Sequence, residues 1–334
     1  MDNLQQPFRS QEQDHQPSGS GDPVIYPSRP ELDVKKTNVW LKSAASLALY
    51  LAFGYVVFRD LTLLLIITAI VIFHELGHFT AMKLFKYKEL GIFFIPLLGA
   101  YASGTKQEVS QRQSIIILLA GPLPGILLGI FLHLVNQHYQ QPLLENTAIL
   151  LLFLNLLNLL PIYPLDGGQI LNRLFLDEHH IISRSFVLLS ALAMAWVSWK
   201  FFYPNFIFYL LLYFPVTILM RLKQEIDNDH IIRKIEQAGA DLNKAYEDIG
   251  DQEYWETRNI LIQYHPDLRD IPPAPPYVYD AREDKVIYTL QGLLQRLITM
   301  DLGIAGKIIV ILVWVACFYS PFLLNMPMNI FQTR

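Results

Sequence analysis

The chain has 334 residues, of which 52% are apolar and 13% aromatic, and its formal net charge is −4. So high an apolar content exceeds that of ordinary soluble domains and indicates a membrane protein. The balance of charge excludes a basic, nucleic-acid-binding protein, and a single cysteine, Cys317, excludes both a disulfide framework and a thiolate metal site.

Residues 1–37 are rich in Gln, Pro, Ser, Asp and Gly and lack the apolar core of a secretory signal peptide, so we expect a disordered tail. Apolar runs follow that are long enough to cross a lipid bilayer as helices. They predict about seven spans, near 38–58, 61–82, 113–135, 145–172 (interrupted), 183–202, 204–221 and 305–324. The first six would form a membrane domain over 38–221.

Lysine and arginine are concentrated in alternate connections between these spans. Because such connections stay in the cytoplasm, the pattern predicts a cytoplasmic N-terminus. It also places the polar segment 222–302, which contains two helix-like stretches and a stiff IPPAPPYVYD connector, on the cytoplasmic side. A last span and a short tail then occupy 303–334.

The connection ELGIFFIPLLGAYASGT, between the second and third spans, is too apolar for an ordinary loop. Pro96, Gly99 and Gly104 interrupt it too often for a helix. It predicts either a re-entrant hairpin, buried in protein at membrane depth, or an interfacial loop against the lipid headgroups.

Three titratable residues interrupt the second span in the sequence VIFHELGH. His74 and His78 are four residues apart, so they share one face of a helix as two ligands of one metal must. Glu75 can reach a metal-bound water without being a ligand, which is the H-E-x-x-H arrangement of zinc hydrolases. Histidines that merely bond to neighbouring helices are the alternative, but Glu75 would then need a partner of its own.

A catalytic zinc needs a third protein ligand, and Asp166 is the outstanding candidate. Apart from Glu75, it is the one acid of the membrane domain with apolar surroundings. The helix rise places both motifs roughly 20–25 Å into spans that cross in the same direction, so they can meet. Pro161 and Pro164 break the helix before Asp166, which could equally cap the half-helix that follows.

The pair of motifs, HELGH and NLLPIYPLDG, resembles the signatures of the site-2 protease family of intramembrane zinc metalloproteases. The resemblance covers residues 61–175. It implies an all-α polytopic membrane protein with a three-helix catalytic core, in which His74, His78 and Asp166 bind one zinc ion and Glu75 activates water. It also implies that Asn158 holds the substrate carbonyl or its oxyanion.

Some features of that family are not expected here. The 79 residues between His78 and Asn158 leave no room for an inserted PDZ domain, and the C-terminal segment does not resemble cystathionine-synthase-type nucleotide-binding modules. AGPLPG, residues 120–125, is similar to a Gly-Pro stretch of the family that often continues to an asparagine, but Gly125 stands at that position.

We therefore expect a zinc endopeptidase that cuts a membrane-protein substrate, of the single-span kind that the resemblance implies, in or near its transmembrane segment. A multispan prenyl-protein endopeptidase also carries H-E-x-x-H, but its third ligand is a later membrane glutamate that this sequence lacks. A metal transporter would carry ligand pairs along several spans. An inactive scaffold would have no need of Glu75.

Overall fold

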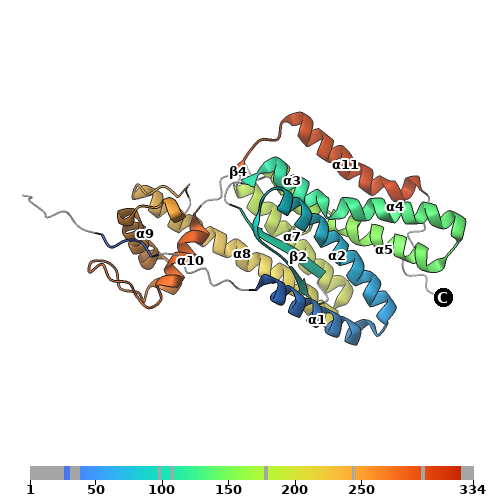
Figure 1. Ribbon diagram of the computed structural model, residues 1–334, viewed down its shortest axis with the longest axis horizontal. Coiled ribbons are helices and arrows are strands. Elements are labelled where there is room, and N and C mark those ends of the chain that lie inside the picture. Colours follow the sequence, from blue (N-terminus) through green and yellow to red (C-terminus); the bar gives the residue numbers. More distant parts are fainter. Residues whose placement is uncertain are drawn as a thin grey trace, which may run out of the picture.

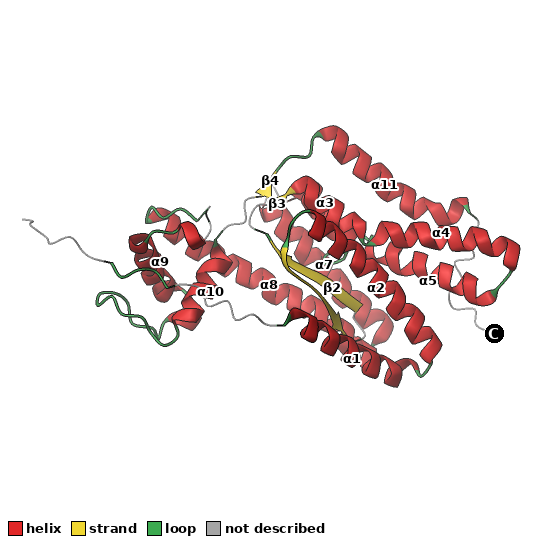
Figure 2. Cartoon of the chain, in the orientation of Figure 1, coloured by secondary structure: helices red, strands yellow, loops and turns green. Residues whose placement is uncertain are grey.

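The computed structural model describes residues 26–30, 38–96, 99–106, 109–176, 180–242, 244, 246–294 and 298–324. The protein is mostly helical, with two short two-stranded sheets (Figure 2). The helices are α1 Val39–Phe58, α2 Leu61–Leu84, α3 Gln111–Ala120, α4 Pro122–Tyr139, α5 Pro142–Asn158, α6 Asp166–Leu171, α7 His180–Phe202, α8 Phe206–Gln237, α9 Asp251–Tyr264, α10 Glu283–Leu293 and α11 Ile304–Leu323, with a π-helical turn at Asn172–Leu176 and 3-10 turns at Tyr246–Asp248 and Pro266–Leu268. The strands are β1 Lys88–Ile95, β2 Gly99–Thr105, β3 Val109–Ser110 and β4 Ile298–Thr299.

Five helical stretches of the described residues are long and apolar enough to cross a membrane. They are Val39–Phe58, Leu61–Leu84, Gln111–Tyr139, His180–Phe202 and Ile304–Leu323, and they coincide with five expected spans. The two other expected spans are not among them. Region 145–172 begins within α5, a helix of only 17 residues that ends at Asn158, before the break that precedes α6. Most of region 204–221 lies in α8, which continues into polar sequence. The expected number of seven is therefore not confirmed.

Polar residues begin the helices that lead to the site. Asp60 caps α2 by accepting a hydrogen bond from the Leu63 N–H (3.0 Å), and Ser110 caps α3 through the Gln113 N–H (3.2 Å). Arg59, with a φ of 53°, ends α1 in the left-handed conformation. Only Arg59 and Asp60 thus separate α1 from α2, so these helices run as antiparallel neighbours.

The apolar connection after α2 folds as an antiparallel hairpin of β1 and β2, in which Phe93 pairs with Tyr101. The hairpin packs on α1: the Phe94 N–H donates to Ser46 Oγ (3.1 Å), and the rings of Phe94 and Tyr50 lie 5.9 Å apart. A hairpin is thus present where one was expected. Its depth in the bilayer stays a prediction.

The segment after the apolar part of α8 forms a compact helical unit with α9 and α10, at the opposite end of the molecule from α4 and α5 (Figure 1). Its core holds a buried ion pair, in which Arg258 Nε and Nη2 donate to the two carboxylate oxygens of Glu283 at 2.6 and 2.9 Å. The two parallel bonds fix both side chains in one geometry. The cytoplasmic location of this unit stays a prediction.

The N-terminal tail differs in part from the disorder expected over 1–37. Residues 26–30 have a defined, extended course against the helical unit, because Trp255 and two tyrosines bond to their backbone. The rest of the tail lies outside the described residues.

Candidate active site

Helix α2 buries the H-E-x-x-H residues. His74, Glu75 and His78 expose only 6%, 6% and 7% of their surfaces. The spacing of four residues places the two rings on one face of α2, where their centroids lie 4.7 Å apart. The third predicted ligand, Asp166, comes from a different part of the chain.

Asp166 begins α6, directly after the break that Pro161 and Pro164 predict. Side chains hold the broken segment in place: the Tyr163 N–H donates to Ser190 Oγ on α7 (3.2 Å), and Gln169 Nε2 donates to the Pro164 carbonyl (2.9 Å). Leu165 is the N-cap residue of α6 and Asp166 is its first helical residue, so Asp166 does not occupy the capping position.

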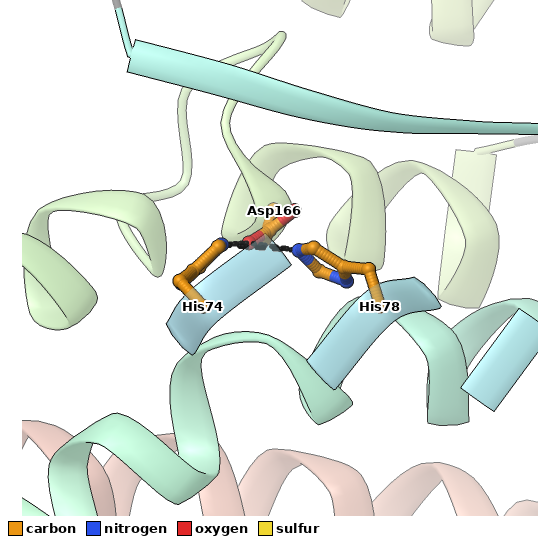
Figure 3. A group of neighbouring side chains, drawn as sticks. All are labelled: His74, His78 and Asp166. Carbon is orange, nitrogen blue, oxygen red and sulfur yellow. Dashed lines mark hydrogen bonds and ion pairs between the residues drawn. The ribbon is translucent and has the colours of Figure 1, made fainter. Parts of the chain in front are cut away.

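The three predicted ligands converge from these two elements (Figure 3). The Nε2 atoms of His74 and His78 lie 3.0 Å apart, and Asp166 Oδ2 lies 3.1 and 3.3 Å from them. Two ligands held at about 2.0–2.1 Å by a tetrahedral zinc ion are roughly 3.3 Å from each other. The triangle therefore has the size that one zinc ion requires.

Hydrogen bonds on the far side of each ring fix its tautomer. Asn155 Nδ2 donates to the Leu151 carbonyl (2.7 Å), which leaves Asn155 Oδ1 to accept from His74 Nδ1 (2.8 Å). His78 Nδ1 donates to the Ile117 carbonyl (2.7 Å). Both Nε2 atoms consequently present lone pairs, as metal-binding histidines do.

The centre therefore gathers three acceptors without a donor. Two imidazole lone pairs face Asp166 Oδ2, which is buried and has no hydrogen-bond partner among the described residues. Buried groups of this kind repel one another unless a cation lies between them. The donor set of two nitrogens and one carboxylate oxygen fits zinc.

Glycines let the neighbouring helix approach the centre. A Cβ atom on Gly121, at the start of α4, would lie 2.3 Å from His78 Nε2 and 2.9 Å from His74 Nε2. One on Gly125 would lie 2.2 Å from Asn155 Nδ2. Any other residue at either position would displace the histidines or the amide that orients one of them.

Glu75 faces a cavity of about 80 Å³ that His74, Asn155 and Asn158 also line, together with Gly99 and Ala100 of β2. Since one water needs roughly 10–15 Å³, the cavity has room for several. Glu75 Oε2 is buried without a hydrogen-bond partner among the described residues, so it is available to a water molecule there.

Asn158 lies in the cavity wall but does not belong to the cluster. Its amide makes a 3.3 Å hydrogen bond to the Leu154 carbonyl of its own helix, whereas Asn155 contacts His74. Asn155 was not predicted from the sequence. The available signal was a second amide in the apolar run FLNLLN, where a polar side chain needs a partner.

Comparison with known proteins finds a family that matches part of the chain. Residues 62–148 match the model of Peptidase family M50. The chain is 32% identical over 114 residues to the zinc metalloprotease MJ0392 of Methanocaldococcus jannaschii, which is 33% of each chain. It is also 32% identical over 116 residues to stage IV sporulation protein FB of Bacillus subtilis, 34% of this chain and 40% of that one.

The matches thus span about a third of this chain and between a third and two fifths of these relatives. The family model includes His74, Glu75 and His78 but ends before Asn158 and Asp166. The positions of those two residues beside the histidines are therefore seen only in the structure, independently of the family match.

Proposed function

The chain carries a Peptidase family M50 domain, that of the site-2 proteases, and from this premise we propose that it is an intramembrane zinc metalloendopeptidase. Its substrate would be a membrane protein, cut in or near a transmembrane segment. The observation that carries the proposal is the convergence of His74, His78 and Asp166 beside a buried carboxylate that binds none of them.

Each residue then has a role in hydrolysis. A zinc ion held by the three ligands would polarise the scissile carbonyl and acidify a water. Glu75 takes a proton from the attacking water and delivers it to the amine as the C–N bond breaks. Asn158, which lines the same cavity, donates its amide to the developing oxyanion.

The hairpin supplies a place for an extended substrate. A helical substrate has no free carbonyl, so its cleavage site must unwind. β2 pairs only with β1 among the described strands, and its residues Gly99 and Ala100 line the cavity beside Glu75. An unwound segment that pairs with β2 would therefore lie along the cavity, in the strand-addition mode of recognition.

Two features support proteolysis over the alternatives. The third candidate ligand at the centre is an aspartate from α6 and not the glutamate of a prenyl-protein endopeptidase. Glu75 is not needed to hold a metal, yet it is buried at an energetic cost, which a scaffold or a transporter would not require. We infer that the substrate is a single-span regulator released by regulated proteolysis. We also infer that the active site lies toward the cytoplasmic side of the membrane.

Two conservative substitutions test the proposal. Glu75→Gln removes the base but no ligand, so we expect turnover to be lost while one zinc per chain remains, measured by metal analysis of the purified protein. Asp166→Asn weakens a ligand, so zinc occupancy should fall. Cleavage at the wild-type rate by Glu75→Gln would contradict the mechanism, and unchanged zinc in Asp166→Asn would remove Asp166 from the ligand set.

The same Glu75→Gln variant identifies the substrate. A comparison of membrane proteomes from cells with wild type and variant should show a single-span protein that accumulates uncleaved in the variant. Asp284→Asn, an exposed substitution on α10, provides the matched control and should leave that protein at its wild-type level.

A further inference from the structure

The tail residues Tyr26–Pro–Ser–Arg–Pro30 lie in an extended conformation on the helical unit, where Figure 1 shows the dark blue segment beside α9 and α10. Four aromatic side chains receive them: Tyr246, Trp255, Tyr277 and Tyr279, here called the aromatic platform. Tyr277 and Tyr279 come from the proline-rich connector between α9 and α10, for which the sequence suggested only stiffness.

The platform binds the backbone of the tail. Trp255 Nε1 donates to the Pro27 carbonyl (2.9 Å), Tyr279 Oη to the Ser28 carbonyl, and Tyr246 Oη to the Pro30 carbonyl (2.9 Å). A proline-rich extended segment has no internal hydrogen bonds, so its carbonyls are free to accept. These three hydrogen bonds thus select an extended tail, and they do not depend on the side chains of the tail residues that accept them.

Arg29 supplies the side-chain specificity. Its Nη1 and Nη2 atoms donate to the carbonyls of Tyr246 and Glu247 at 2.5 and 2.6 Å, and its guanidinium carbon lies 5.2 Å from the centre of the Tyr246 ring. The Arg29 N–H donates to Asp251 Oδ1 (2.8 Å). Lysine has no planar fork to bond both carbonyls, so the site discriminates between the two cations.

Contacts inside the unit hold the platform in place. Trp255 stacks on Tyr279 at 5.3 Å with an interplanar angle of 21°, and its ring also lies 5.1 Å from the guanidinium carbon of Arg258. Arg258 is fixed by both oxygens of Glu283. These supports come from the helical unit itself, so the platform is preformed for a ligand.

We propose that the aromatic platform is a peptide-recognition site for extended, proline-flanked segments that contain arginine. Residues 26–30 occupy it in cis, and a segment of the same chemistry from a partner protein competes with them. Other proteins recognise proline-rich peptides in the same way, with aromatic rings on the protein and free carbonyls on the peptide. A tethered segment has an effective concentration on the order of millimolar, so the partner must bind more tightly or the tail must be weakened.

Binding of a free peptide to the full-length chain tests the proposal. The probe is a fluorescent peptide with the sequence of residues 23–33, titrated by anisotropy onto wild type and onto Arg29→Ala, which weakens the tail's hold. We expect saturable binding to Arg29→Ala that is at least tenfold tighter than binding to wild type, because the intact tail competes. A probe peptide with lysine in place of its arginine should bind at least tenfold more weakly.

A second substitution assigns the binding to the platform. Tyr279→Phe, added to Arg29→Ala, removes one donor at a partly exposed position and should weaken probe binding several-fold. Glu75→Gln, added in the same way, should leave it unchanged, because the metal centre takes no part. If folded Arg29→Ala protein binds no probe at about 1 mM, the tether concentration, or if Tyr279→Phe has no effect, the proposal is wrong.

Discussion

Asn155 links His74, one of the two histidines of the sequence motif, to α5. Its amide is oriented by the Leu151 carbonyl and accepts from His74, and the absent side chain of Gly125 leaves the space that the amide fills. Asn155 on α5 thus packs against Gly125 on α4, the position at which the similar Gly-Pro stretch often has an asparagine. We infer that Asn155 is a positioning residue for His74.

Asn155→Leu should lower zinc affinity about 10–100-fold, because the His74 ring loses the partner that fixes its tautomer. Competition with a zinc chelator of known affinity measures the change. Asn158→Ala, one turn along the same helix, is the control: turnover should fall roughly 10²–10³-fold while zinc affinity stays. Equal zinc affinity of Asn155→Leu and wild type would show that His74 needs no such partner.

The sequence predicts the residues of the centre better than their supports. His74 and His78 follow from helical spacing, and Asp166 follows from the rarity of acids at membrane depth. Asn155 and Ile117 do not follow from either argument, because a hydrogen bond between residues far apart in the chain depends on how α2, α3 and α5 pack.

At the scale of elements, the β3–β4 pairing attaches the segment before α11 to the start of α3. Val109 pairs with Ile298 in parallel. Asp301 then accepts from Ser110 Oγ (2.5 Å) and from the Arg112 N–H (2.9 Å). This contact joins residues almost two hundred positions apart, so it holds the last apolar helix against the domain that carries the centre.

The attachment should depend on pH. Burial raises the pKa of Asp301, but hydrogen bonds from Ser110 and the Arg112 N–H outweigh it, so the net pKa is lowered. A lowered folded-state pKa contributes stability above the unfolded value of about 3.9, and that stability is lost as pH falls through the folded pKa. We expect the protection of the Arg112 amide in hydrogen exchange, corrected for the intrinsic rate, to fall below about pH 4.

Asp301→Asn should lower this protection at neutral pH and abolish its dependence on pH. Asp284→Asn, at an exposed position of α10, should leave both unchanged. Protection in Asp301→Asn that still falls with acid would assign the effect to another group.

Helix boundaries show which elements a sequence can predict. The apolar run over 61–82 and the break before Asp166 are local features of the sequence, so α2 and the start of α6 were expected. The length of α8 was not, because its apolar and polar parts form one helix of 32 residues and composition alone suggested two segments. The course of residues 26–30 depends on contacts with residues more than two hundred positions away.

At the scale of the whole molecule, the metal centre joins α2 to α6, which the chain separates by the hairpin and three helices. A ligand that binds only the folded state stabilises it by RT ln(1 + [L]/Kd), about 4 kcal/mol at a thousandfold excess over Kd. Zinc should therefore contribute to the stability of the fold as well as to catalysis.

Removal of zinc by a chelator should lower the melting temperature of the detergent-solubilised protein by several degrees, followed by intrinsic tryptophan fluorescence. Added zinc should restore it. Glu75→Gln, which keeps all three ligands, should show the same shift, whereas Asp166→Asn should show little. A melting temperature that no chelator changes in wild type would contradict a structural contribution of the metal.

The continuous helix α8 has a further consequence as a molecular ruler. Between Leu222 and His230, whose ring lies 5.9 Å from that of Tyr264 on α9, it extends roughly 12 Å at 1.5 Å per residue before it packs into the unit that carries the aromatic platform. An extended chain needs at least about four residues to cover that length. A protein that used both sites at once would need a spacer of at least that order between its arginine segment and its scissile bond, so the helix would select substrates by distance as well as by sequence.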